Sequence, residues 1–324
     1  MKKILLTLSA AALVLASCAK IETVKVDENR AISFSNFVNN PTKAVTTVET
    51  ISSFYVFGNY GADWSGQAFN NEENTAVYYW QPGVTYRFGA YADGDGNKIE
   101  GATYEASTST LTFPNYTPDD SKDLVVATAE HTTDDDVSNE PKVALTFKHM
   151  LSQIKLTFTT DDAATYGLTI KNVKINEAVS VATGEYNATN ATWVEPFTNN
   201  GYVYEEFNEG KVISSGVSAS QVKFVIPQNG TDQLSVTFTA EIAGGEIPNT
   251  STTLTKEFTA NLGHSIADIE ANAWQNGFCY NYTAKISVKN IVENPDELYP
   301  IVFEPSVDDW VDKGNVDVTP APQN

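Results

Sequence analysis

Apolar and polar residues alternate along many short segments of this chain. One segment carries apolar or aromatic residues at every second position, at Val84, Tyr86, Phe88 and Ala90. Alternation with a period of two is typical of a β-strand that is buried on one face. The pattern recurs at 143–147, 154–158, 222–226, 234–238 and 286–288, and turn-forming Gly, Pro, Asn and Asp residues separate these segments. The chain is therefore predicted to be all-β and built from antiparallel β-sandwiches.

Two tandem domains of this kind fit the length of the chain, which has 324 residues. A polar stretch, 130–141, lies near the middle and is followed at once by an alternating segment, 143–147. We therefore place a domain boundary near Lys148. The sequence then predicts an N-terminal β-sandwich domain over residues 18–148 and a C-terminal one over residues 149–324.

The first 18 residues have the organisation of an export signal. Two lysines precede an apolar stretch, 4–14, which is too short to span a bilayer, because a membrane helix needs about 20 apolar residues. Residues 15–18, with the sequence LASC, resemble the lipobox of bacterial lipoproteins. We expect removal of the signal peptide, 1–17, and lipidation of Cys18, for example with palmitate. An ordinary secretory signal with an incidental cysteine is the alternative.

Acidic side chains outnumber basic ones, 41 Asp and Glu against 20 Lys and Arg, which gives a formal net charge of −21. A surface with this charge repels phosphate backbones, so we expect no nucleic-acid partner. Once Cys18 is lipidated, Cys279 is the remaining cysteine, and an intramolecular disulfide is excluded. Stability therefore has to come from packing of the apolar core.

The chain lacks the short motifs of common enzymatic chemistry. It contains no Gly-x-Ser-x-Gly nucleophile motif and no glycine-rich phosphate loop. The three histidines are far apart without metal-ligand spacing, and the acidic segment 93–97 matches only the first half of a calcium loop. We therefore expect no metal, no cofactor and no enzymatic activity. The sequence leaves a catalytic carboxylate pair of the glycosidase type as an open alternative, because so acidic a chain contains many pairs of carboxylates.

Several short motifs, spread over almost the whole chain, occur in the same order as the corresponding motifs of one protein family. They include a Phe-x-His-x-x-x-x-Ile motif and lie at 32–34, 41–44, 54–58, 79–91, 145–154, 274–283 and 307–310. Together they resemble the fimbrillin family, the type V pilins and fimbrillin-like lipoproteins of Bacteroidales. The resemblance implies two transthyretin-like, Greek-key β-sandwich domains. It also implies a lipid-anchored protein of the outer membrane, located at the cell surface in a fimbrium.

The resemblance further implies assembly by strand exchange. In this scheme a trypsin-like protease specific for Arg or Lys removes an N-terminal strand, and a strand from another pilin subunit fills the groove. Arg30, which precedes Ala31 and follows a polar segment, is the expected processing site, whereas Arg87 lies within an alternating strand. Lys43 is the weaker alternative, because a cut there would also discard the strand 32–38. The alternative to a processing role is that Arg30 is an ordinary arginine in a linker.

The run from residue 301 to residue 311 is the candidate donor strand. Pro305 within it lacks an amide donor and therefore favours an edge or a bulge. A plain edge strand of the second sandwich is the alternative, and both interpretations hold if the strand is released only during assembly. The residues that we expect to fill a groove are Ile301, Val302, Phe303, Val307 and Trp310.

These expectations combine into a structural subunit (stalk, tip or accessory) of a type V pilus that mediates cell adhesion. Its partners would be other pilin subunits, the processing protease and, through its lipid, the outer membrane. The alternative is a monomeric surface lipoprotein that binds a glycan or a host ligand through loops at one sandwich end. In that case Trp64 or Trp193 would supply an aromatic contact.

Overall fold

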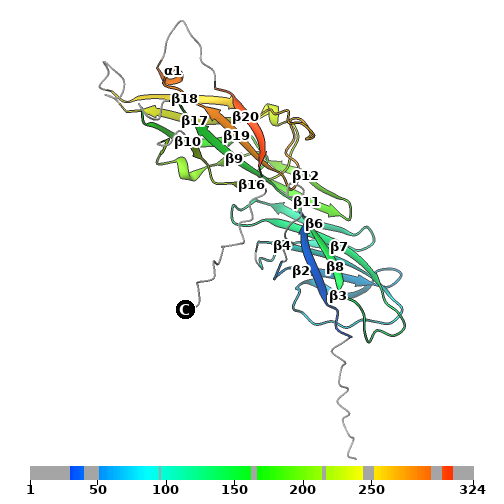
Figure 1. Ribbon diagram of the computed structural model, residues 1–324. Coiled ribbons are helices and arrows are strands. Elements are labelled where there is room, and N and C mark those ends of the chain that lie inside the picture. The colour runs from blue at the N-terminus through cyan, green and yellow to red at the C-terminus, as the bar shows by residue number, and fades with distance from the viewer. Residues whose placement is uncertain are drawn as a thin grey trace, which may run out of the picture.

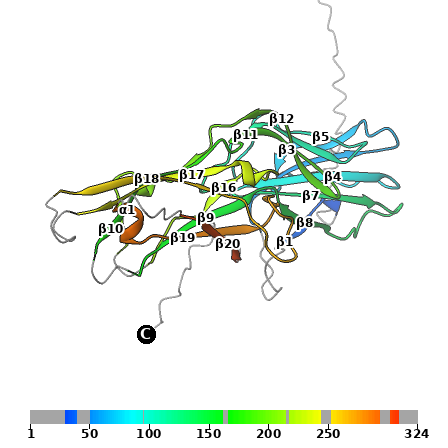
Figure 2. The ribbon, with the colours of Figure 1, turned by 90° about the horizontal axis from the view of Figure 1, so that it is seen from above.

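Strands account for nearly all regular structure in the protein. The computed structural model describes residues 30–39, 51–94, 96–161, 166–213, 217–243, 252–292 and 301–308. The predicted all-β class is confirmed. Figures 1 and 2 show an elongated molecule with the N-terminal strands at one end and the C-terminal strands at the other. The helical elements among the described residues are short, namely α1 (Val288–Ile291), η2 (Glu205–Phe207) and η3 (Thr231–Gln233).

A six-stranded sheet forms the larger part of the N-terminal sandwich. Its order is β1-β8-β7-β4-β2-β3, with β1 (Phe34–Asn39), β2 (Tyr55–Tyr60), β3 (Gly66–Glu73), β4 (Thr85–Asp93), β7 (Leu124–Thr132) and β8 (Val143–His149). The sheet curls so that its two edge strands approach each other. The ring centroids of Phe34 on β1 and Phe69 on β3 are only 5.6 Å apart. The inner face of the curl holds an aromatic core that includes Phe54, Trp80 and Phe88.

A four-stranded sheet packs on the outer face of β4 and completes the N-terminal sandwich. Its order is β12-β11-β6-β5, with β5 (Thr103–Glu105), β6 (Thr110–Tyr116), β11 (Val181–Asn187) and β12 (Asn190–Thr198). Tyr91 and Phe113 meet between the two sheets, with ring centroids 5.2 Å apart. The hairpin β11–β12 follows Lys148 in the chain but pairs with β6, and both views show it beside the N-terminal strands (Figures 1 and 2). The boundary near Lys148 stays a prediction.

Two five-stranded sheets face each other in the C-terminal sandwich. One has the order β13-β10-β17-β18 with β14 also on β10, and the other has the order β15-β9-β19-β20 with β16 also on β9. Phe158 on β9 and Phe238 on β17 meet between them, with ring centroids 5.0 Å apart. The strands are β9 (Ser152–Thr159), β10 (Leu168–Asn176), β13 (Tyr202–Val203), β14 (Lys211–Ile213), β15 (Val217–Ala219), β16 (Lys223–Val225), β17 (Ser235–Ile242), β18 (Leu254–Asn261), β19 (Cys279–Lys285) and β20 (Phe303–Asp308).

Two strand pairs depart from the antiparallel arrangement. β1 runs parallel to β8, and β19 runs parallel to β9, whereas the other pairs between these named strands are antiparallel. A long stretch of chain separates the strands of each parallel pair, so the chain can return in the same direction. Side chains alternate in the same way in both kinds of sheet, so the alternating pattern carries no information on strand direction.

Candidate functional site

Strand β1 is an edge strand that contributes to the core of the N-terminal sandwich. It pairs with β8 over six residues, from Phe34 opposite Val143 to Asn39 opposite Lys148. The ring of Phe34 lies 5.6 to 5.9 Å, centroid to centroid, from the rings of Phe54, Phe69 and Phe88. β8 pairs with its other neighbour, β7, at only two residue pairs, so β1 is the main backbone partner of β8.

The predicted processing site, Arg30–Ala31, lies just before β1 and is bound by backbone hydrogen bonds to the segment 78–80. Ala31 forms an isolated antiparallel bridge with Tyr79. The Trp80 amide donates to the Arg30 carbonyl at 3.0 Å, and the Ile32 amide donates to the Tyr78 carbonyl at 2.8 Å. The Nε atom of the Arg30 side chain is buried and has no hydrogen-bond partner among the described residues. A protease that binds an extended peptide can therefore reach the Arg30–Ala31 bond only after this bridge opens.

The predicted donor segment occupies the edge of its own sandwich. β20 pairs antiparallel with β19, and Pro305 lies opposite Tyr282 at this edge. Phe303 is buried, and its ring centroid lies 6.0 Å from that of Phe158. Ile301 is also buried, whereas Val302 is 68% exposed. This position matches the plain edge-strand alternative for the subunit, and the donor role stays a prediction.

The structure separates the predicted site residues into two places. Arg30 and Ala31 lie on the N-terminal sandwich, and the described part of the donor segment lies on the C-terminal one. Three predicted residues lie outside the described residues: Cys18, Lys43 and Trp310. Lipidation of Cys18 and the groove-filling role of Trp310 therefore stay predictions.

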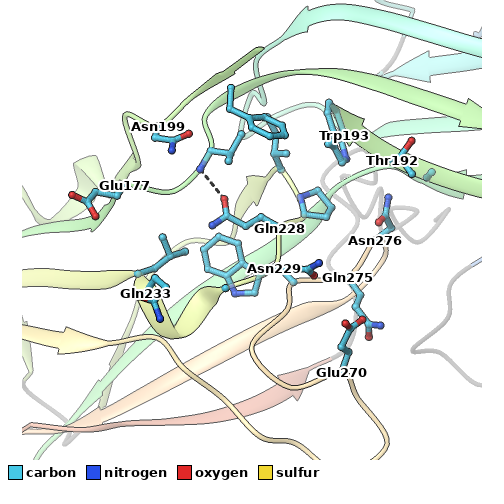
Figure 3. Close-up of a pocket in the computed structure, with 18 of the residues that line it drawn as sticks. Glu177, Thr192, Trp193, Asn199, Gln228, Asn229, Gln233, Glu270, Gln275 and Asn276 are labelled. Atoms are coloured by element: carbon cyan, nitrogen blue, oxygen red, sulfur yellow. Dashed lines mark hydrogen bonds between the residues drawn. The ribbon is translucent and has the colours of Figure 1, made fainter. Parts of the chain in front are cut away.

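A cavity of about 830 Å³ lies where hairpin β11–β12 approaches the C-terminal sandwich. It is lined by residues of β12, by the loop 226–230 after β16 and by the loop 270–276 before β19. Figure 3 shows Glu177 and Asn199 on one side and Trp193 and Asn276 on the opposite side. Trp193 is a residue that the sequence singles out, but the amides around it come from separate segments and carry no local signal.

Backbone and side-chain contacts fix Trp193 in the wall of this cavity. Its indole N–H donates to the Met150 carbonyl at 3.0 Å, and the Asn276 amide donates to the same carbonyl at 3.0 Å. The ring centroid of Trp193 lies 5.6 Å from that of Tyr116. Behind the ring, Gly184 leaves the necessary space, since a Cβ there would lie 2.9 Å from the indole. Trp193 is therefore fixed in position by several contacts and is half-buried.

Several titratable groups gather where the two sandwiches meet. The Tyr116 hydroxyl donates to Asp93 Oδ1 at 2.8 Å, and burial raises the pKa of the Asp93 carboxyl above its usual value against the opposing effect of this hydrogen bond. His149 Nδ1 lies 2.7 Å from Asp123 Oδ2. Lys223 on β16 pairs with Asp120 across the junction. Each of these contacts joins groups within the protein, which fits a structural role.

The described residues contain neither a cluster of metal ligands nor a long apolar helix. Within the seven described ranges, no three His, Cys, Asp or Glu side chains are grouped so that they could hold a metal ion. In the same ranges, no helix is long and apolar enough to cross a membrane. Trp64, the other tryptophan considered as a ligand contact, lies under the guanidinium of Arg87, 4.2 Å from its ring centroid. A smaller cavity of about 380 Å³ adjoins this pair.

Comparison with known proteins identifies the family. A profile described as fimbrillin-like matches residues 21–310, which is most of the chain. The protein therefore belongs to the fimbrillin-like family, as the sequence motifs indicate. Membership supports a fimbrial or adhesive role at the cell surface and a structural rather than an enzymatic protein. A sequence search of curated proteins finds no match.

Solved structures with a similar chain path include the following three. A candidate cell adhesion protein from Bacteroides uniformis is 20% identical, with 87% of this chain and 99% of that chain covered and a TM-score of 0.48. One from Bacteroides ovatus is 14% identical, with 87% and 98% covered and a TM-score of 0.46. The fimbrial anchor protein Mfa2 from Porphyromonas gingivalis is 12% identical, with 87% and 98% covered and a TM-score of 0.42.

Proposed function

We propose that this protein is a structural subunit of a type V pilus that mediates cell adhesion. In this proposal it is exported as a lipoprotein, anchored in the outer membrane through Cys18, cut by an Arg- or Lys-specific protease, and joined to other pilin subunits by strand exchange. Membership of the fimbrillin-like family supports the fimbrial role. The alternative, a monomeric surface lipoprotein that binds a glycan or host ligand, differs in having no polymer.

The observation that carries the proposal is the position of β1. It is an edge strand, it fills the aromatic core through Phe34, and it supplies most of the backbone pairing of β8. Its loss would expose both apolar side chains and unpaired backbone groups along one line. Such an edge is completed by an extended segment that supplies hydrogen bonds and apolar side chains together. A head-to-tail contact of this kind yields a filament when its rotation does not close into a ring.

The two candidate cuts have different consequences for β1. A cut after Arg30 releases the lipid-bearing segment and leaves β1 in the sheet with a free N-terminal end. We propose that an incoming strand then displaces β1, which after the cut is connected to the sandwich only at its C-terminal end. A cut after Lys43 would remove β1 from the chain altogether. At the level of the sequence the loss of that strand counts against Lys43, but in this proposal removal of β1 would be a direct way to open a groove for an incoming strand.

Unboiled gels of the protein matured in its native host test this proposal. The wild type is expected to form a ladder of polymers. If Arg30 is the essential site, Arg30→Ala abolishes the ladder and Lys43→Ala retains it, whereas the reverse result would move the site to Lys43. Arg87→Ala provides the matched arginine control and is expected to retain the ladder, because Arg87 lies within β4.

A wild type that stays a sharp monomer would reject the strand-exchange proposal and favour the monomeric alternative. A ladder that persists in the double variant Arg30→Ala/Lys43→Ala would reject processing at either position. Deletion from Ile301 onward tests the donor segment, and it is expected to block polymerisation. Because Phe303 packs in the subunit's own core, a far-ultraviolet circular dichroism spectrum of the deleted protein is needed to show that it is folded. A folded deletion variant that still polymerises would exclude this segment as donor.

A further inference from the structure

The cavity beside Trp193 combines three segments that are distant in the sequence. Strand β12 supplies Trp193 and Phe197, Asn199 directly follows that strand, and the C-terminal sandwich supplies Gln228 and Gln275. Figure 3 shows Trp193, Asn199, Gln228 and Gln275 arranged around a common space, and Phe197 also lines it. Its volume of about 830 Å³ falls in the range of small-molecule sites, roughly 300–1,000 Å³.

The polar groups of the cavity are of two kinds. Some support the fold, such as Gln228, whose Oε1 accepts from the Val179 amide at 2.7 Å. Others are available, because the side chains of Asn199 and Gln275 make no hydrogen bond to another described residue. A side-chain amide carries both a donor and an acceptor in one plane. Neighbouring hydroxyl groups, which also donate and accept, are suitable partners for such amides.

Aromatic and charged groups restrict the ligand further. Trp193 is half-buried and fixed by its contacts, and Phe197, which also lines the cavity, is 45% exposed. Aromatic faces pack well on apolar C–H surfaces, which a sugar ring presents beside its hydroxyls. Glu177 and Glu270 line the cavity, and none of its described lining residues is Lys or Arg. The negative charge disfavours phosphates, sulfated sugars and acidic sugars.

We propose that this cavity binds a neutral oligosaccharide. In the bound state a sugar ring packs on Trp193, and the amides of Asn199 and Gln275 bond its hydroxyls. The ligand then contacts β12 and the C-terminal sandwich together, so it bridges the two sandwiches. The proposal goes beyond the pilus function and does not depend on polymerisation, since the cavity is complete within one subunit.

An array of neutral and acidic oligosaccharides, probed with the purified unassembled chain, tests the proposal. At least one neutral glycan and no acidic one is expected to bind, with a dissociation constant of about 1 mM or tighter by isothermal titration calorimetry. The double variant Asn199→Ala/Gln275→Ala is expected to weaken that binding by at least about tenfold, because it removes two hydrogen-bonding groups. Neither side chain supports the fold through a hydrogen bond, so the variant is expected to remain folded.

Gln67→Ala/Asn70→Ala is the matched control, because both residues are exposed on β3 at the far end of the molecule. This control is expected to bind like the wild type, and Trp64→Ala likewise. Absence of any bound neutral glycan overturns the proposal. Equal affinity of the cavity variant and the wild type also overturns it, since the glycan would then bind elsewhere. Gel ladders report on assembly separately, so failure of the sugar site and failure of the pilus proposal are distinguishable.

Discussion

Truncation of Phe34 to alanine tests how strongly β1 is held in the unassembled subunit. A fully buried Phe→Ala change costs about 3–5 kcal/mol of unfolding free energy. Phe34 is only half-buried, but its ring meets those of Phe54, Phe69 and Phe88 edge-on at 5.6 to 5.9 Å between centroids. We therefore expect Phe34→Ala to lower the unfolding free energy by about 2–3 kcal/mol.

Phe37→Ala is the matched control on the same strand. Phe37 is 39% exposed and lies on the opposite face of β1, so its truncation should cost less than about 1 kcal/mol. Urea denaturation followed by near-ultraviolet circular dichroism measures both values, and the strand-propensity cost cancels between them. Equal losses in the two variants would refute the inference that β1 is held by its inward face.

The same change has a second consequence under the pilus proposal. If β1 leaves the sheet during assembly, Phe34 stabilises the free subunit but not the polymer. Phe34→Ala should therefore accelerate ladder formation in the matured protein while it destabilises the monomer. Slower assembly, with the variant still folded, would argue that β1 stays in place when subunits join.

Two further predictions concern the junction of the sandwiches. Gly184→Ala places a Cβ 2.9 Å from the Trp193 indole. This change should lower the free energy of unfolding, measured by urea denaturation, by about 1–3 kcal/mol and shift the tryptophan fluorescence. Unchanged stability and an unchanged spectrum would contradict the close packing of Gly184 on Trp193. Burial raises the pKa of Asp93, so this group lowers stability as pH rises from below its unfolded value of about 3.8 through its folded-state pKa. Asp93→Asn should therefore gain stability relative to the wild type across that interval, and a gain that does not depend on pH would exclude the titration of Asp93 as its cause.

The hairpin β11–β12 links the assembly proposal to the binding proposal. It pairs with β6 in the N-terminal sandwich, while its outer strand β12 lines the cavity shared with the C-terminal sandwich. The Met150 carbonyl, between β8 and β9, receives hydrogen bonds from Trp193 and Asn276 at this same junction. The relative placement of the sandwiches therefore depends on a few polar contacts as well as on packing.

The candidate sites could be predicted only in part. Tryptophan is conspicuous in a sequence, so Trp193 could be singled out, although nothing distinguished it from Trp64. Asn199, Gln228 and Gln275 could not be found, because isolated amides are common in loops and their convergence requires the fold. Arg30 could be proposed from its polar surroundings, but the bridge between Ala31 and Tyr79 joins segments almost fifty residues apart and has no local signature.

The sequence by itself determined the all-β class and the order of many strands, because side-chain alternation and turn residues act over a few neighbouring positions. It also carried the motifs of the fimbrillin-like family. The parallel placement of β1 and β19, the return of hairpin β11–β12 to β6, and the cavity at the junction were decided only by the tertiary structure. These features depend on which apolar surfaces fit together across long stretches of chain, and a period of two is the same whichever partner a strand takes.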